Sequence, residues 1–307
     1  MNRRALIAAS LTAALLTTTA ACGGGADSAD GRLPVVASFY PVAWLAERIG
    51  GANVSVSTLT KPGAEPHDLE LSPRQVAQIT DTKLTVYVKG VQPAVDDAVS
   101  QHAGDRALDA ASLVKTLPAA PEPEGEEEEE GHADVAYDPH VWLDPARMAV
   151  IATALGDRLA EADPGHAAGY KADAAKLASE LTALDGAFAG GLKNCTAREF
   201  VTAHSAFGYL ADRYGLKQIG IAGIDPEAEP SPRRLAELRD EIKRTGVTTV
   251  FTETLVSPKI AQTLADSAGV ETAVLDPVEG VRPGSSDDYL TIQNRNLSAL
   301  GTALGCK

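Results

Sequence analysis

The sequence has little positive charge and no segment dense in Lys or Arg. Its 307 residues include 27 Lys and Arg against 42 Asp and Glu, which gives a formal net charge of −15. Nucleic-acid binding depends on attraction between basic side chains and phosphates, so this balance excludes nucleic acid as a partner. Aromatic residues make up only 5% of the chain, but 44% of residues are hydrophobic, which is enough for the cores of two lobes of ordinary size.

Several motifs of enzymes and transport ATPases are also missing. The sequence contains no HExxH pattern of zinc proteases and no GxSxG turn of serine hydrolases. It also lacks the GxxxxGK[ST] loop that holds nucleotide phosphates. We therefore expect neither an enzyme of these classes nor the ATPase of a transport system.

Long hydrophobic runs are absent as well, because no stretch reaches the roughly 20 apolar residues that a membrane-spanning helix needs. The first residues instead follow the pattern of a secretory signal. Arg3 and Arg4 precede the apolar run Ala5 to Leu16, and small residues continue to Ala21. We expect residues 1–21 to be a signal peptide and residues 22–32, rich in Gly, Ser and Asp, to be a flexible tether.

The small residues directly before Cys22, and the glycines after it, resemble a bacterial lipoprotein signal. This resemblance implies that Cys22 becomes the lipidated first residue and anchors the protein on the outer face of the cytoplasmic membrane. Thr19 departs from the pattern, which usually has Leu or another aliphatic residue there. The alternative is simple secretion with a free N-terminus.

The chain has three cysteines, so assigning Cys22 to the lipid leaves the even pair Cys195 and Cys306. An extracytoplasmic location permits a disulfide between them, which would close a loop of about 110 residues. The alternative is two unpaired thiols. Neither cysteine has the spacing of a metal-binding pair, which favours the disulfide over two unpaired thiols.

Short β-branched runs alternate with helical segments along the rest of the chain, a pattern typical of parallel α/β sheets. We expect an α/β fold of two Rossmann-like lobes with mostly parallel sheets, joined by a long helix that spans both lobes. The expected divisions are an N-terminal lobe over 33–145, connecting helices over 146–192 and a C-terminal lobe over 193–307. The expected strands are 33–38, 54–60 and 84–88 in the first lobe and 199–203, 216–221, 247–252 and 271–275 in the second.

An acidic segment interrupts the first lobe. Residues 118–132 include five consecutive glutamates, Glu126 to Glu130, whose mutual repulsion opposes packing into a core. We expect a surface loop. It is either a solvated insertion or a region that collects cations near a binding site.

Three histidines and one aspartate stand in loops that follow expected strands or carry turn residues. They are His67, His140, His204 and Asp276. Their intervals place two in each lobe, so the four can meet only in the cleft between the lobes. Pro66 and Pro139 directly precede two of the histidines and restrain the backbone there.

The segments around these residues resemble the metal-binding motifs of the zinc and manganese solute-binding proteins of ABC transporters. The resemblance covers essentially the whole mature chain. It is carried by Gly63 to Pro73, Asp138 to Pro145, His204 to Tyr209 and Leu275 to Pro277. It implies capture of one divalent cation outside the cytoplasmic membrane and delivery to a permease, with a separate chain as the ATPase.

Carried over residue by residue, the family site implies His67, His140 and His204 as imidazole ligands and Asp276 as the carboxylate. Glu65 is an alternative carboxylate. Manganese members carry Glu where this chain has His204, and three imidazoles favour zinc over manganese, so Zn²⁺ is the expected cargo. A manganese-specific protein of the same family is the alternative, and a monomer is expected.

Two other functions compete with metal capture. Three histidines and a carboxylate could surround a catalytic zinc, but such a site normally keeps one position open for water, whereas four protein ligands close it. We therefore expect no enzyme activity. Surface adhesion is the third reading, and no motif of the sequence argues for it.

Overall fold

The computed structural model describes residues 31–119 and 136–307. The expected signal peptide, Cys22 and most of the acidic segment lie outside the described residues. Among the described residues, no helix combines the length and the apolar character needed to cross a membrane.

The N-terminal lobe is built on a four-stranded parallel sheet with the strand order β2-β1-β3-β4. Its strands are β1 (Leu33–Ala37), β2 (Val54–Thr58), β3 (Leu84–Tyr87) and β4 (Ala107–Asp109). Its helices are α1 (Tyr40–Gly50), α2 (Pro73–Asp81) and α3 (Pro93–His102). Strand β4 was not predicted, because its three residues carry no usable pattern of alternation.

The C-terminal lobe repeats this plan with a second four-stranded parallel sheet, ordered β6-β5-β7-β8. Its strands are β5 (Glu199–Thr202), β6 (Lys217–Gly220), β7 (Thr249–Thr252) and β8 (Glu271–Val274). Its helices are α6 (Gly208–Tyr214), α7 (Pro232–Thr245), α8 (Lys259–Ala268) and α9 (Tyr289–Ala303). The expected fold of two α/β lobes with parallel sheets is confirmed.

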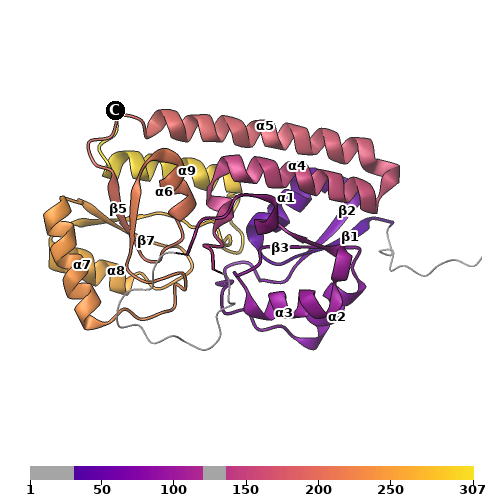
Figure 1. Ribbon diagram of the computed structural model, residues 1–307, viewed down its shortest axis with the longest axis horizontal. Helices are drawn as coiled ribbons and strands as arrows, with labels where there is room; N and C mark the ends of the chain where they lie inside the picture. Colours follow the sequence, from indigo (N-terminus) through magenta and orange to yellow (C-terminus); the bar gives the residue numbers. More distant parts are fainter. Residues whose placement is uncertain (1–30, 120–135) are drawn as a thin grey trace, which may run out of the picture.

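Two long helices join the lobes. Helix α4 (Pro145–Ala162) packs along α5 (Ala167–Gly191), and α5 contacts both α1 and α9. Figure 1 shows α5 running over both lobes. The sequence predicts that the second helix begins at Pro164, but a 3₁₀ turn, Pro164–His166, comes first. At this junction Asp163 Oδ2 accepts one hydrogen bond from the hydroxyl of Tyr170. The same oxygen lies 2.6 Å from Nδ1 of His166.

Local sequence explains where several helices begin. Ser72 caps α2 in a capping box with Gln75, directly before Pro73 at the first helical position. Asp144 caps α4 by accepting the N–H of Ala146, again before a proline.

The main hydrophobic core lies between the sheets and the connecting helices and is continuous across the two lobes. A smaller cluster packs the N-terminal sheet against α2 and α3, and another packs the C-terminal sheet against α7 and α8. The predicted disulfide between Cys195 and Cys306 is present, and it ties the C-terminus to the segment before β5. Because one core runs through both lobes, the loops between the lobes are attached to continuously packed elements.

Candidate metal centre

The candidate site is formed by loops that follow the carboxyl ends of parallel strands, where ligand sites of α/β sheets generally lie. His67 stands in the loop between β2 and α2, and His204 in the loop between β5 and α6. His140 directly precedes the 3₁₀ turn Val141–Leu143, which leads into α4. Glu279 stands in the loop after β8.

The side chains of His67, His140, His204 and Glu279 meet between the lobes. Each offers one ligand atom, and these four atoms lie within 4.8 Å of one another. Glu279 Oε1 lies 3.5 Å from Nε2 of His67, 3.7 Å from Nε2 of His140 and 3.5 Å from Nε2 of His204. Two ligands of a tetrahedral zinc ion, each about 2.0–2.2 Å from the metal, are separated by roughly 3.3–3.6 Å. The three distances from Glu279 Oε1 therefore suit a zinc ion bound by Glu279 and the histidines.

The four ligand atoms are buried and have no hydrogen-bond partner. The side chains of His140 and His204 are fully buried, while His67 is 6% exposed and Glu279 is 1% exposed. The three Nε2 atoms and Glu279 Oε1 all lack a partner in the structure. Buried polar atoms in proteins are normally satisfied, so four such atoms facing one point indicate a bound cation.

Buried carboxylates orient two of the three imidazoles. Asp138 Oδ1 lies 2.7 Å from Nδ1 of His140 and also accepts the backbone N–H of that residue. Glu253, which directly follows β7, contacts Nδ1 of His204 at 2.7 Å. A carboxylate on Nδ1 keeps the proton on that nitrogen and leaves Nε2 free to bind a metal. Neither carboxylate was predicted from the sequence, although Asp138 stands two residues before His140.

His67 is positioned through its backbone. Glu65 Oε2 accepts the backbone N–H of His67 at 2.9 Å, and Gln92 donates from Nε2 to the carbonyl oxygen of Pro66 at 3.1 Å. Burial raises the pKa of Glu65 to about 7, with Glu279 acting in the same direction and His67 opposing it. Glu65, expected as the alternative carboxylate, is not in the cluster and instead supports the loop that carries His67.

Charges in the site shift the pKa values of the histidines in different directions. Burial opposes the charged form of His204, but Glu253 and Glu279 outweigh it and raise the pKa of this imidazole well above 6.5. Glu279 raises the pKa of His67 against the effect of burial in the same way. Burial dominates at His140 and lowers its pKa despite Asp138. Burial disfavours the ionised form of Glu279, yet His204 and His67 overcome this effect and lower its pKa.

The structure brings together the three histidines expected from the sequence, but its carboxylate is a different one. Asp276 is not part of the cluster. Its two carboxylate oxygens accept hydrogen bonds from the N–H of Val278 and the hydroxyl of Thr254, so they are engaged elsewhere. Burial raises the pKa of Asp276 to about 6, against these two hydrogen bonds. Glu279, three residues further on, lies in the cluster where Asp276 was expected.

The lobes are linked beside the site by buried hydrogen bonds. Trp142 donates from Nε1 to the carbonyl oxygen of Pro277 at 2.8 Å, and its own carbonyl oxygen accepts the hydroxyl of Tyr289 at 2.6 Å. The Tyr209 hydroxyl donates to the carbonyl oxygen of Asp138 at 2.5 Å. The segment that carries His140 is therefore fixed to the C-terminal lobe on either side of the ligand.

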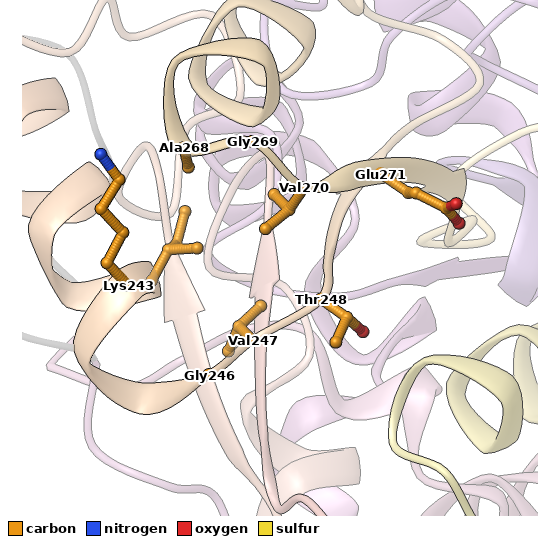
Figure 2. Close-up of a pocket in the computed structure, with 9 residues that line it drawn as sticks. Lys243, Gly246, Val247, Thr248, Ala268, Gly269, Val270 and Glu271 are labelled. Carbon is orange, nitrogen blue, oxygen red and sulfur yellow. The ribbon is translucent and has the colours of Figure 1, made fainter.

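A separate cavity of about 470 Å³ lies at the amino ends of β7 and β8, whereas the candidate site lies beyond the carboxyl ends of the strands. Figure 2 shows it between the ends of α7 and α8, with Gly246 and Gly269 near the starts of β7 and β8. Its charged lining residues are Lys243 and Glu271, and it contains no histidine or cysteine. This cavity has no metal-binding donor set and is not the candidate centre.

The sequence matches the family described as the periplasmic component A of the zinc-uptake complex, ZnuA, over residues 35–303. The chain belongs to this family. The zinc-binding lipoprotein AdcA of Streptococcus pneumoniae is 36% identical in an alignment of 281 positions that covers 89% of this chain. The chain spans only 56% of the length of that relative. The high-affinity zinc uptake protein ZnuA of Bacillus subtilis is 34% identical over 91% of this chain and 90% of its own length.

Solved structures of ZnuA-family proteins share the fold. The zinc-bound ZnuA-like domain of Streptococcus pneumoniae AdcA has a TM-score of 0.75 and 33% identity, covering 89% of this chain and 99% of that one. The laminin-binding protein Lmb of Streptococcus agalactiae, described as a bifunctional adhesin and metal transporter, has a TM-score of 0.77 and 32% identity over the same shares.

Proposed function

We propose that this ZnuA-family chain captures one zinc ion outside the cytoplasmic membrane and delivers it to an ABC permease served by a separate ATPase. The ion would be held by Nε2 of His67, His140 and His204 and by Oε1 of Glu279. The observation that carries this proposal is the set of four buried, unpartnered ligand atoms, in which Glu279 lies 3.5–3.7 Å from each histidine, close to the ligand separation of a tetrahedral zinc site. The zinc-binding and zinc-uptake names of the relatives support the same cargo.

The donor set favours zinc over manganese. Three imidazoles and one carboxylate form a nitrogen-rich, four-donor group, whereas manganese prefers more oxygen ligands and binds nitrogen sites more weakly than zinc. The buried carboxylates on His140 and His204 strengthen both imidazoles as zinc ligands.

The same donor set argues against a hydrolase. A catalytic zinc ion keeps a position for water or substrate, whereas the four protein atoms here surround the centre and are all buried. We therefore infer a binding protein without enzyme activity.

Anchoring through a lipid on Cys22 is the proposed means of keeping the protein near its permease. The zinc-binding lipoprotein name of the pneumococcal relative supports this proposal. Mass spectrometry of the mature protein tests it: we expect an acylated Cys22 and release of Cys22→Ser into the soluble fraction. An unmodified Cys22 in membrane-extracted protein would refute the anchor.

The proposed function is tested by competitive titration of metal-free protein with a chelator of known zinc affinity. We expect one zinc ion per chain and tighter binding of zinc than of manganese, with the affinity greatly reduced in Glu279→Ala and His67→Ala. His102→Ala is the matched control, because His102 lies at the exposed end of α3. Delivery is tested by deleting the protein: we expect a growth defect that zinc relieves. Failure of the wild-type protein to bind zinc would overturn the proposal.

A further inference from the structure

The turn that carries Glu279 contains an uncommon backbone conformation. Val278 has a φ of +59°, and it is the one residue other than glycine with positive φ among residues 31–119 and 136–307. A β-branched side chain disfavours this left-handed region, so the surrounding structure must hold the residue there. Val278 directly precedes Glu279, and its backbone conformation therefore sets the direction in which the glutamate side chain leaves the chain.

The side chain of Asp276 stabilises this turn through two hydrogen bonds. Its Oδ1 accepts the backbone N–H of Val278 at 2.8 Å. Its Oδ2 accepts the hydroxyl of Thr254, from the loop after β7, at 3.0 Å. Asp276 thus connects the left-handed residue to the neighbouring strand of the sheet.

Asn296 on helix α9 fixes the backbone of Asp276. Its Nδ2 donates to the carbonyl oxygen of Asp276 at 2.7 Å, and its Oδ1 accepts the backbone N–H of Asp276 at 2.9 Å. Asn296 is only 2% exposed, so water does not compete strongly for these bonds. The carbonyl oxygen of Pro277, the next residue, accepts the indole N–H of Trp142. Each residue between β8 and Glu279, apart from Leu275, is therefore held by a side chain from another element or by Asp276 itself.

We propose that Asp276, held by Asn296, is a positioning residue that keeps Val278 left-handed and thereby directs Glu279 toward the three histidines. This inference rests on the proposed function, because it concerns the carboxylate of the same zinc site. Without the hydrogen bond from Val278, this residue relaxes to negative φ, and the Glu279 carboxylate leaves its place 3.5 Å from His67 and His204. Asp276 contributes to zinc binding in this way without touching the metal.

The experiment compares two substitutions of Asp276 that separate positioning from ligation. Asp276→Ala removes both hydrogen bonds to the side chain. Asp276→Asn retains an oxygen that accepts the Val278 N–H and an amide that can donate to the Thr254 hydroxyl, but it removes the carboxylate charge. Zinc dissociation constants are measured by competition with a chelator. The visible absorption of bound Co²⁺, which is intense in four-coordinate sites and weak in six-coordinate ones, reports the ligand geometry.

We expect Asp276→Ala to raise the zinc dissociation constant about 10- to 100-fold, the usual effect of removing a group that orients a ligand. Its Co²⁺ absorption should weaken, whereas Asp276→Asn should remain close to wild type in both measurements. Adding Val278→Gly to Asp276→Ala should restore part of the affinity, because glycine adopts positive φ readily.

Asp288→Ala is the matched control. It removes a carboxylate that caps α9 by accepting the N–H and the hydroxyl of Thr291, and that carboxylate has no hydrogen bond to residues 276–279. This variant should melt at a lower temperature and bind zinc as the wild type does. The inference is overturned if Asp276→Ala binds zinc normally, if Asp276→Asn loses as much affinity as Asp276→Ala, or if Val278→Gly restores nothing. Glu279→Ala and wild type are titrated in parallel: absence of zinc binding by wild type would refute the proposed function instead.

Discussion

Glu253 Oε1 contacts two groups of His204 at once, the backbone N–H at 3.1 Å and the ring Nδ1 at 2.7 Å. The two contacts fix both the position of the residue and the rotation of its ring, so that Nε2 faces Glu279. Glu253 lies 49 residues further along the chain, at the end of the neighbouring strand β7. Parallel pairing of β5 with β7 brings the two loops together.

Removing Glu253 should weaken zinc binding although this residue does not reach the metal. We expect Glu253→Ala to raise the zinc dissociation constant about 10- to 100-fold, because His204 loses its orienting partner. Glu253→Gln should have a smaller effect, since its amide oxygen still accepts both hydrogen bonds. Competitive titration measures both, with the exposed Glu271→Ala on β8 as control. Equal affinities of Glu253→Ala and wild type would contradict this role.

Zinc affinity should fall as the pH is lowered, and the decrease should begin above pH 6.5. The pKa of His204 is raised, because Glu253 and Glu279 outweigh the opposing effect of burial. The proton on a raised-pKa histidine is lost only as the pH rises through that pKa, and zinc must displace it at lower pH. Dissociation constants measured from about pH 8 to about pH 5.5 test this, bracketing the usual histidine range. A constant affinity over that range would exclude a site dominated by histidines.

Zinc should stabilise the folded protein, because the four-atom site exists only after the loops from both lobes have come together. At a free zinc concentration of 100 times the dissociation constant, linkage predicts about 2.7 kcal/mol of added stability. Calorimetry should show a higher melting temperature with zinc, and a chelator should reverse the shift. Glu279→Ala should lose most of the shift, whereas His166→Ala, at the turn between α4 and α5, should retain it. An equal shift in both variants would place the ion elsewhere.

Changing His204 to glutamate should move the metal preference toward manganese, because an oxygen ligand replaces a nitrogen ligand. The neighbouring residue Glu253 must be changed as well for the full effect. Glu253 lies against this side chain, so a second carboxylate there would face a like charge in a buried place. The double variant His204→Glu with Glu253→Gln avoids this repulsion and should show the larger decrease in the zinc-to-manganese affinity ratio. An unchanged ratio would argue against His204 as a ligand.

The disulfide should stabilise the fold without affecting zinc binding. Cys195 and Cys306 are 111 residues apart, and removing a bond that closes so large a loop should cost about 2–5 kcal/mol of unfolding free energy. The bond lies before the amino end of β5, whereas His204 follows its carboxyl end. Denaturant unfolding and zinc titration of the double variant Cys195→Ser and Cys306→Ser measure the two effects. Weaker zinc binding in a folded double variant would show that the bond also supports the site.

The sequence predicts most of the fold because each element carries its own local pattern. Most strands of the two lobes are short runs with β-branched residues, and Ser72 with Pro73 marks the start of α2 in the sequence as in the structure. The end strand β4 was missed, since three residues show no periodicity. The disulfide followed from counting cysteines.

The carboxylate of the site could not be predicted from local pattern. Asp276 directly follows β8 and has the position and chemistry of a ligand, yet its oxygens bond Val278 and Thr254. Glu279 reaches the histidines only because Val278 adopts a left-handed conformation that a β-branched residue rarely takes. Tertiary contacts impose that conformation, and the sequence around Val278 gives no sign of it. Glu253 was missed for a similar reason, because its partner His204 is distant in sequence.

A crystal structure of the zinc-loaded protein, with anomalous scattering data collected at the zinc absorption edge, would show directly which residues hold the ion. We expect one strong anomalous peak between the lobes, coordinated by Nε2 of His67, His140 and His204 and by Glu279, with Asp276 still bonded to Val278. A peak coordinated by Asp276 in place of Glu279, or a peak away from the three histidines, would contradict this expectation.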